Sequence, residues 1–97
     1  MPKAYWVTCY RSISDPQKVA AYAKLAPPAV TPFGARYIAR GSAVHAFEAG
    51  QKERTVIAEF PSAEKAIAAY NSPAYKEALN ALGDGAVRDI RIIEALE

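Results

Sequence analysis

With 97 residues, 52% of them hydrophobic and 23% charged, the sequence predicts one globular domain over residues 1–97 and excludes a disordered chain. The formal net charge is only +2, and the basic residues are spread from Lys3 to Arg91 without a run, so we expect no nucleic acid partner. No apolar stretch approaches the roughly 18 residues that span a membrane, so we expect no membrane partner.

The first elements in chain order are a strand and a helix. Residues 4–10 are rich in β-branched and aromatic types, which is typical of a strand. Asp15 and Pro16 predict a helix start, because aspartate accepts hydrogen bonds from free amides and proline is tolerated in the first turn. We expect Pro27-Pro28 to end the regular helix, since neither proline has an amide to donate, and one more loose turn to follow as far as Pro32. The apolar residues at helical spacing between these ends are Val19, Tyr22, Ala23 and Ala26.

The middle of the chain predicts two strands joined by a hairpin. Gly34 opens the first of them, which we expect to run to about Glu48 with a break at Gly41-Ser42. Residues 49–53 predict the hairpin loop, and residues 54–60 predict the next strand.

The last part of the chain predicts a helix in two pieces and a final strand. Ser62 is the expected N-cap of the first piece, and Ser72-Pro73 provide a fresh N-cap and first helical position for the second piece. Residues 83–85 stop the helix, and residues 87–96 predict the last strand. The apolar positions expected on the two pieces are Ala63, Ala66, Ile67, Tyr70, Tyr75, Leu79 and Leu82.

These elements follow the order β-α-β-β-α-β. Right-handed crossovers on such a chain give an α+β fold, the ferredoxin-like plait, in which a four-stranded antiparallel sheet carries its helices on one face. A sheet with one wet face shows apolar–polar alternation, but both sides of these strands carry large apolar groups. In the first strand the two sides are Trp6, Thr8 and Tyr10 against Tyr5, Val7 and Cys9.

The helices can cover only one of the two apolar faces. The simplest cover for the other is the same face of a second copy, related by a two-fold axis. We therefore expect a homodimer through the sheet faces, with a barrel-like space between them.

Cys9 is the only cysteine, so the chain can form no internal disulfide or thiolate cluster. Histidines, cysteines and carboxylates do not occur at metal-ligand spacing, and no phosphate-binding loop appears, so we expect no metal and no cofactor. The first residues lack the architecture of a signal peptide, so a cytoplasmic location is expected.

Four segments resemble one known family. They are Asp15-Pro16, residues 33–41 (FGARYIARG), residues 59–62 (EFPS) and residues 70–75 (YNSPAY). In these the chain resembles the domain-of-unknown-function 1330 family over nearly its whole length. That family belongs to the dimeric α/β barrel superfamily, which includes small monooxygenases, haem-degrading enzymes, muconolactone isomerases and stress proteins. The resemblance implies a ferredoxin-like subunit in a dimeric α/β barrel, and it implies no particular activity.

Glu59 and His45 are the candidate catalytic residues. If Phe60 packs under the second helix, alternation directs Glu59 to the opposite face, where a carboxylate is either an acid or base of a cavity or half of an ion pair with Arg36 or Arg40. His45 is the only histidine and is expected on the second strand, where it either transfers protons or is simply exposed.

The candidate ligand-binding residues lie at the predicted helix break and on the strands. A break offers free amides and short polar side chains at a pocket mouth, although it also serves simply to bend a helix around a sheet. Trp6 and the tyrosines Tyr5, Tyr10, Tyr22 and Tyr37 either line an apolar ligand space or belong to the core. The predicted ligand-binding set is Arg40, Tyr70, Asn71, Ser72, Tyr75 and Trp6.

Two functions from different classes follow from these residues. In the first, the dimer holds a small apolar or aromatic molecule and carries out cofactor-free monooxygenase- or isomerase-like chemistry. In the second, it is a small-molecule-binding or stress-related module without turnover. The sequence does not decide between an enzyme and a binding protein.

Overall fold

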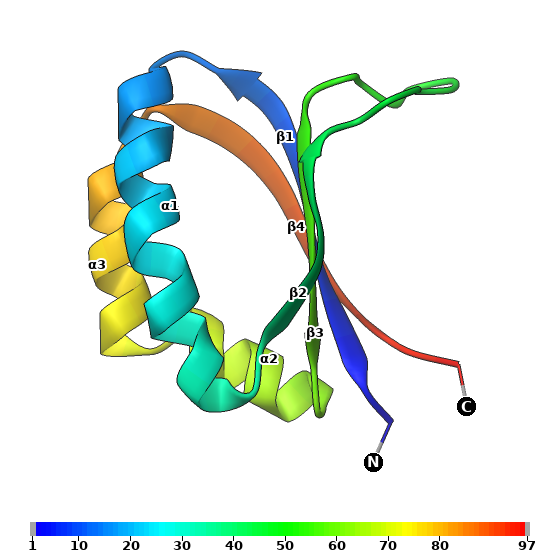
Figure 1. Ribbon diagram of the computed structural model, residues 1–97, viewed down its shortest axis with the longest axis vertical. Helices are drawn as coiled ribbons and strands as arrows, with labels where there is room; N and C mark the ends of the chain where they lie inside the picture. Colours follow the sequence, from blue (N-terminus) through cyan, green and yellow to red (C-terminus); the bar gives the residue numbers. More distant parts are fainter. Residues whose placement is uncertain (1, 97) are drawn as a thin grey trace.

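The structure, a computed structural model, describes residues 2–96. The elements, in chain order, are β1 (Ala4–Ile13), α1 (Pro16–Val30), a 3₁₀ turn (Thr31–Phe33), β2 (Arg36–Ser42), β3 (Arg54–Phe60), α2 (Ala63–Tyr70), α3 (Pro73–Leu82) and β4 (Ala86–Glu94). The strands form one antiparallel sheet in the order β2-β3-β1-β4. All three helices cover one face of this sheet and leave the other face bare (Figure 1). This is the predicted ferredoxin-like arrangement, with its second helix in two pieces.

The helix starts lie where the sequence predicts them. The Asp15 side chain accepts hydrogen bonds from the amides of Gln17 and Lys18, and Pro16 occupies the first turn. Ser72 caps α3 by accepting from the amide of Tyr75, with Pro73 as the first helical residue. Short polar side chains that replace missing backbone partners therefore set the boundaries of the helices.

The predicted end of α1 at Pro27-Pro28 is wrong, because the helix continues to Val30. The prolines remove two amide donors, but the last turn buries Ala29 and Val30 against the core. The Thr31 hydroxyl and amide both donate to the carbonyl of Pro27, which closes the helix end. Burial and this cap outweigh the two missing hydrogen bonds.

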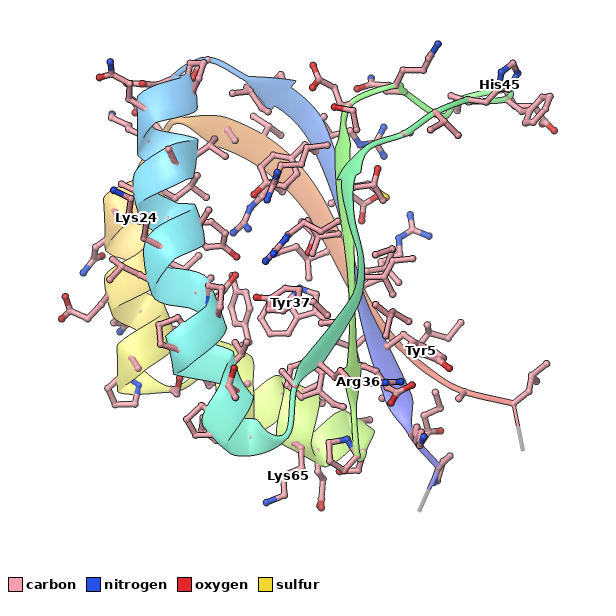
Figure 2. The ribbon with its side chains drawn as sticks, in the orientation of Figure 1. Tyr5, Lys24, Arg36, Tyr37, His45 and Lys65 are labelled. Atoms are coloured by element: carbon pink, nitrogen blue, oxygen red, sulfur yellow. The ribbon has the colours of Figure 1, made fainter. Side chains whose placement is uncertain are left out.

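The predicted extent of β2 is also wrong, since the strand ends at Ser42 rather than near Glu48. Beyond Ser42 a single backbone bond, from the amide of Ala43 to the carbonyl of Glu53, continues the ladder. Within β2 the register shifts between Tyr37 and Ala39, so the strand contains a bulge. His45 consequently lies in the segment between β2 and β3, away from the sheet (Figure 2).

The core lies between the sheet and the helices. Trp6 stacks on Phe60 with ring centroids 5.8 Å apart, and it meets Tyr75 edge-on at 5.1 Å. Small buried residues on the helices, Ala26, Ala66 and Ala78, allow the helices to approach these rings closely. None of the helices within residues 2–96 is both long enough and apolar enough to cross a membrane.

One glycine fixes the entry into β2. Gly34 has φ of 92°, a left-handed conformation that other residues adopt only with strain. A Cβ atom at this position would lie 2.7 Å from Cγ of Pro61. Gly34 thus holds the turn before β2 against the turn that follows β3.

Candidate functional site

Side chains on the helix-facing side of the sheet form three rows across the strands. The register gives an aromatic row of Tyr37, Ala58, Trp6 and Ile92, a middle row of Arg40, Val56, Thr8 and Ile90, and a basic row in which Arg54 and Arg88 flank Tyr10. Bordered by these rows, a cavity of about 40 Å³ lies between the sheet and helices α1 and α3. The cavity therefore has an aromatic end and a basic end.

The aromatic end is rigid and largely dry. Trp6 and Tyr75 are almost fully buried, at 5% and 1% exposure, and their rings are in contact. The indole Nε1–H of Trp6 donates to Oγ1 of Thr8 at 2.9 Å, so the only indole donor is already satisfied. Tyr37 enters the same space from β2 and lies between the sheet and the helices (Figure 2).

Three guanidinium groups line the cavity, each over a tyrosine ring, and two of them, Arg54 and Arg88, lie at its basic end. The Cζ atom of Arg40 is 4.9 Å from the ring centre of Tyr37, and that of Arg54 is 6.0 Å from the ring centre of Tyr10. Arg88 lies 5.6 Å from the Tyr10 ring centre. Attraction between a guanidinium and an aromatic face orients such side chains, and it leaves their N–H edges free to donate.

The six arginines of the chain divide into two sets by face. On the helix-free face, Arg36 pairs with Glu59, and Arg11 and Arg91 both pair with Asp89. The other three, Arg40, Arg54 and Arg88, line the cavity, and none of them pairs with a carboxylate of residues 2–96. Nε of Arg54 and Nη1 of Arg88 are buried atoms without a hydrogen-bond partner among the described residues. The cavity thus contains concentrated positive charge that the described protein groups do not neutralise.

Two tyrosine hydroxyls are joined within the cavity wall. The hydroxyl oxygens of Tyr22 on α1 and Tyr75 on α3 are 2.6 Å apart, and either one can donate. Burial, followed by the effects of Tyr22, raises the pKa of Tyr75 above its usual value. Burial is also the main cause that raises the pKa of Tyr37 to about 12. These two phenols are protonated at neutral pH, so they act as hydrogen-bond donors.

The described lining of the cavity suits a molecule with hydrogen-bond acceptors. It contains arginines, phenols and one threonine, and it contains no aspartate, glutamate or histidine. Groups of three potential metal ligands are absent from residues 2–96 as well. The lining can bind, orient and donate protons to a ligand, but it offers no ordinary general base at neutral pH.

The predicted ligand-binding residues separate into three locations. Trp6, Arg40 and Tyr75 come together in the cavity, with Tyr10, Tyr22 and Tyr37 around them. Tyr70 and Asn71 line a separate hollow beside Ile67, although the Tyr70 ring also contacts Trp6 at 5.7 Å. The Ser72 hydroxyl is buried, accepts from the Tyr75 amide and donates to the Ala69 carbonyl.

Glu59 lies on the helix-free face, as alternation predicts. Its carboxylate Oε1 is 3.5 Å from Nη2 of Arg36 and 3.6 Å from Nζ of Lys3, and its side chain is 16% exposed. Arg36 and Tyr5 lie on this same side of the sheet (Figure 2). Of the two arginines expected as its partner, Arg36 pairs with Glu59, whereas Arg40 does not, because the β2 bulge turns Arg40 to the helix side.

The predicted histidine lies apart from both groups. His45 lines a hollow of about 420 Å³ between the β2–β3 segment and the helix-free face, together with Cys9 and Arg91. The ring of Phe47 is its aromatic neighbour, with ring centroids 4.5 Å apart. His45, Glu59 and the cavity residues therefore do not form one constellation.

Arg54 and Arg88 are the functional candidates that sequence reasoning missed. The signal was present in the alternation of their strands. Arg54 has the same parity as Val56 and Phe60, and Arg88 has the same parity as Ile90, so both had to face the helices. A charged side chain at a core-facing position is the informative exception in a strand pattern.

The fold is shared with solved structures of low sequence identity. A protein of unknown function from Rhodopseudomonas palustris matches with a TM-score of 0.77 and 17% identity, over 99% of this chain and 84% of that one. A dimeric ferredoxin-like protein of unknown function from Thermobifida fusca matches with a TM-score of 0.65 and 19% identity, over 97% and 92%. SnoaB, a cofactor-independent oxygenase from Streptomyces nogalater, matches with a TM-score of 0.64 and 10% identity, over 100% and 96%.

The sequence itself matches one family model. Among curated proteins no match is found. The model of the domain of unknown function DUF1330 matches residues 3–96. The chain therefore belongs to the DUF1330 family, and its fold is the ferredoxin-like fold of these solved structures.

Proposed function

We propose that the protein binds a small apolar or aromatic molecule in the cavity between its sheet and its helices, as a homodimer joined through the helix-free sheet faces. The observation that carries this proposal is the aromatic lining of a cavity inside an otherwise packed layer. Small-molecule sites are concave, mostly apolar, and equipped with a few polar groups that fix orientation. Trp6, Tyr10, Tyr37 and Tyr75 provide the apolar walls, and the phenols and guanidinium groups provide the polar ones.

The walls favour a flat ligand. Aromatic rings attract one another in offset-stacked and edge-on arrangements, which are worth about 0.5–1.5 kcal/mol beyond the area that they bury. Trp6 already meets Tyr75 edge-on, so a planar ligand between Trp6 and Tyr37 would continue an existing cluster. The exposed Arg40 marks the mouth of the cavity.

The dimer rests on the apolarity of the bare sheet face. Val7, Ile57 and Ile93 lie on this face, and Ile93 is 60% exposed. Phe47, in the segment that continues beyond the sheet, is 78% exposed. Large apolar groups at such exposure are typical of an interaction surface. The similar protein from Thermobifida fusca is described as dimeric, which agrees with this assembly.

Turnover is the second candidate function. The Tyr22–Tyr75 hydroxyl pair is a proton donor in the cavity wall, which suits isomerase-like proton transfer. The fold neighbour SnoaB is described as a cofactor-independent oxygenase, which supports oxygenase-like chemistry as the alternative to isomerase-like proton transfer. Recovery of a bound ligand, chemically unchanged after incubation with the protein in air, would contradict both forms of turnover.

Native mass spectrometry of the freshly purified protein tests the proposal, since it reports the number of subunits and any retained small molecule together. The matched variants are Ala23→Trp, which fills the cavity from α1, and Ala21→Trp, which places the same side chain on the exposed side of that helix. We expect a dimer that retains or takes up small aromatic molecules, with uptake lost only in Ala23→Trp. Uptake that is equal in both variants would refute the cavity as the site.

A further inference from the structure

We infer that the ligand of this cavity is a small organic anion, namely a carboxylate on a flat apolar body, and that Arg54 and Arg88 bind its negative head. This inference rests on the proposed small-molecule function and adds the chemical class of the ligand. Its starting observation is that the six arginines differ in their ion pairs. The three on the helix-free face have carboxylate partners, and the three in the cavity have none among residues 2–96.

A guanidinium that is partly buried without a counter-charge is costly to keep. Taking a charge out of water is unfavourable unless it is paired and hydrogen-bonded. Nε of Arg54 and Nη1 of Arg88 are both removed from solvent without an acceptor in the described part of the chain. Arginine does not lose its proton in proteins, so these groups cannot avoid the desolvation penalty by becoming neutral. An anion in the cavity supplies both the missing charge and the missing acceptors.

The geometry brings the two guanidinium groups to one place from strands that are not neighbours. Arg54 is on β3 and Arg88 is on β4, with β1 between them. Both lie over the ring of Tyr10 on β1, at 6.0 Å and 5.6 Å from its centre. Arg88 is additionally fixed by the Tyr22 ring on α1, at 4.6 Å. Stacking on fixed rings orders the arginines in advance, so less side-chain entropy is lost when a ligand binds.

The neighbouring polar groups are donors too. Tyr75 and Tyr37 are protonated at neutral pH, as tyrosines ordinarily are, and burial raises the pKa of each phenol further. In the Tyr22–Tyr75 pair one hydroxyl donates to the other, and the accepting hydroxyl keeps its own hydrogen for a ligand. A carboxylate carries a negative charge and two acceptor oxygens and satisfies such a lining, whereas a neutral amide has one acceptor oxygen and no charge to match the guanidinium groups.

The aromatic end argues for an organic anion rather than a bare inorganic one. The basic row and the aromatic row lie two rows, or four residues, apart on the same sheet face, which separates their backbones by about 13 Å at the usual rise of a strand. A carboxylate held at the basic end therefore reaches the aromatic end only through an apolar body that extends from it. A free inorganic anion would fill only the basic end and leave the space beside Trp6 and Tyr37 unoccupied.

Matched ligand pairs measured by protein NMR titration test the inference. The probes are benzoate, phenylacetate and cinnamate, each paired with its neutral amide, with acetate and inorganic phosphate as anions that lack a ring. Charge-assisted hydrogen bonds are stronger than neutral ones, so we expect at least one carboxylate to bind ten-fold or more tightly than its amide, a difference of about 1.4 kcal/mol or more. Acetate and phosphate should bind more weakly than that carboxylate.

Two variants and one control locate the effect. Arg54→Met and Arg88→Met keep most of the apolar stem of the side chain and remove the charge, and each should lower carboxylate affinity at least ten-fold while changing amide affinity less than three-fold. Lys24→Met removes one exposed positive charge from α1 and should leave both affinities unchanged. Circular dichroism and the NMR spectrum of each variant establish that it is folded.

The outcomes separate this inference from the proposal beneath it. Amides that bind as tightly as the carboxylates, with binding lost in Ala23→Trp, would refute the anionic head and leave the small-molecule cavity in place. Phosphate or acetate binding that equals benzoate binding would refute the organic body. If neither the carboxylates nor the amides bind at millimolar concentration, both the inference and the proposed function fail.

Discussion

The guanidinium carbon of Arg88 lies 4.6 Å from the ring centre of Tyr22, so an arginine of the last strand is held against the first helix. The hydroxyl of Tyr22 in turn contacts that of Tyr75 on α3 at 2.6 Å. Three elements that are far apart in the sequence, β4, α1 and α3, are thereby joined through polar side chains inside the layer between sheet and helices. A chain that needed only stability could fill this layer with apolar groups, so the polar contacts point to a binding role.

Replacement of Arg54 by methionine should not lower the stability of the ligand-free protein. Its Nε is buried and unpartnered among the described residues, and its contact with the Tyr10 ring is long, at 6.0 Å. Leaving a buried donor unsatisfied costs about 1–3 kcal/mol, and methionine removes that donor while it keeps most of the apolar stem. We expect urea denaturation without ligand to show an unchanged or slightly higher free energy of unfolding. A loss above about 1 kcal/mol would mean that Arg54 has a structural partner.

Replacement of Tyr75 by phenylalanine should lower stability at neutral pH and flatten its alkaline dependence. The lost hydrogen bond to Tyr22 accounts for about 0.5–1.5 kcal/mol. The pKa of Tyr75 is raised in the folded state, so its contribution is complete below the unfolded pKa of about 10 and is lost as the pH rises toward the folded value. Denaturation at about pH 8 and about pH 11 should therefore show a smaller difference in the variant than in the wild type. An equal or larger difference would contradict the raised pKa.

Replacement of Ser72 by alanine tests the helix break. The Ser72 hydroxyl accepts from the Tyr75 amide and donates to the Ala69 carbonyl, and it is buried. Ser62 makes only the accepting bond, from the Lys65 amide, so Ser62→Ala is a matched control. We expect a cost of about 1–2 kcal/mol at Ser72 and a smaller one at Ser62, measured by thermal or urea unfolding. Equal costs would mean that the donated bond to Ala69 contributes nothing.

Much of this architecture follows from local rules. Asp15, Ser62 and Ser72 mark the starts of their helices, because each side chain replaces a missing backbone partner. Alternation correctly divides β3, β4 and the part of β1 up to Tyr10, where the register shifts, between the two faces. The same alternation also places Arg54 and Arg88 on the core-facing side. A charged residue is unusual there, and this is what distinguishes them as functional candidates.

Other features depend on tertiary contacts that no local pattern contains. The side to which Arg40 points depends on the bulge between Tyr37 and Ala39, and a bulge is an offset between two strands. The continuation of α1 through Pro27-Pro28 depends on how much its last turn buries. The cavity is lined by side chains from all four strands and from α1 and α3, and only the assembled layers bring these side chains together.

Glu59 has two possible roles, and the nearly isosteric change Glu59→Gln gives a different outcome for each. As an acid or base it would lose ligand binding or turnover while the dimer stays intact. As a structural group it would keep ligand binding, because its carboxylate lies on the other side of the sheet from the cavity, 3.5 Å from Nη2 of Arg36. The geometry favours the second role.

Glu59 also lies within the face through which we propose that two copies join. Its side chain is 16% exposed, while Arg36 and Lys3 beside it are largely exposed, so a partner subunit would bury the pair further. Removing one member of a buried pair costs about 3–5 kcal/mol, and an exposed pair contributes only about 0–1 kcal/mol. We expect Glu59→Gln to weaken dimerisation by a free energy between these limits, as measured by sedimentation equilibrium. The affinity for benzoate should not change. Asp84→Asn, which removes a carboxylate from the exposed pair with Lys18 at the far end of α3, is the control and should leave the dimer as it is. An intact dimer that no longer binds its ligand would assign Glu59 to the site instead.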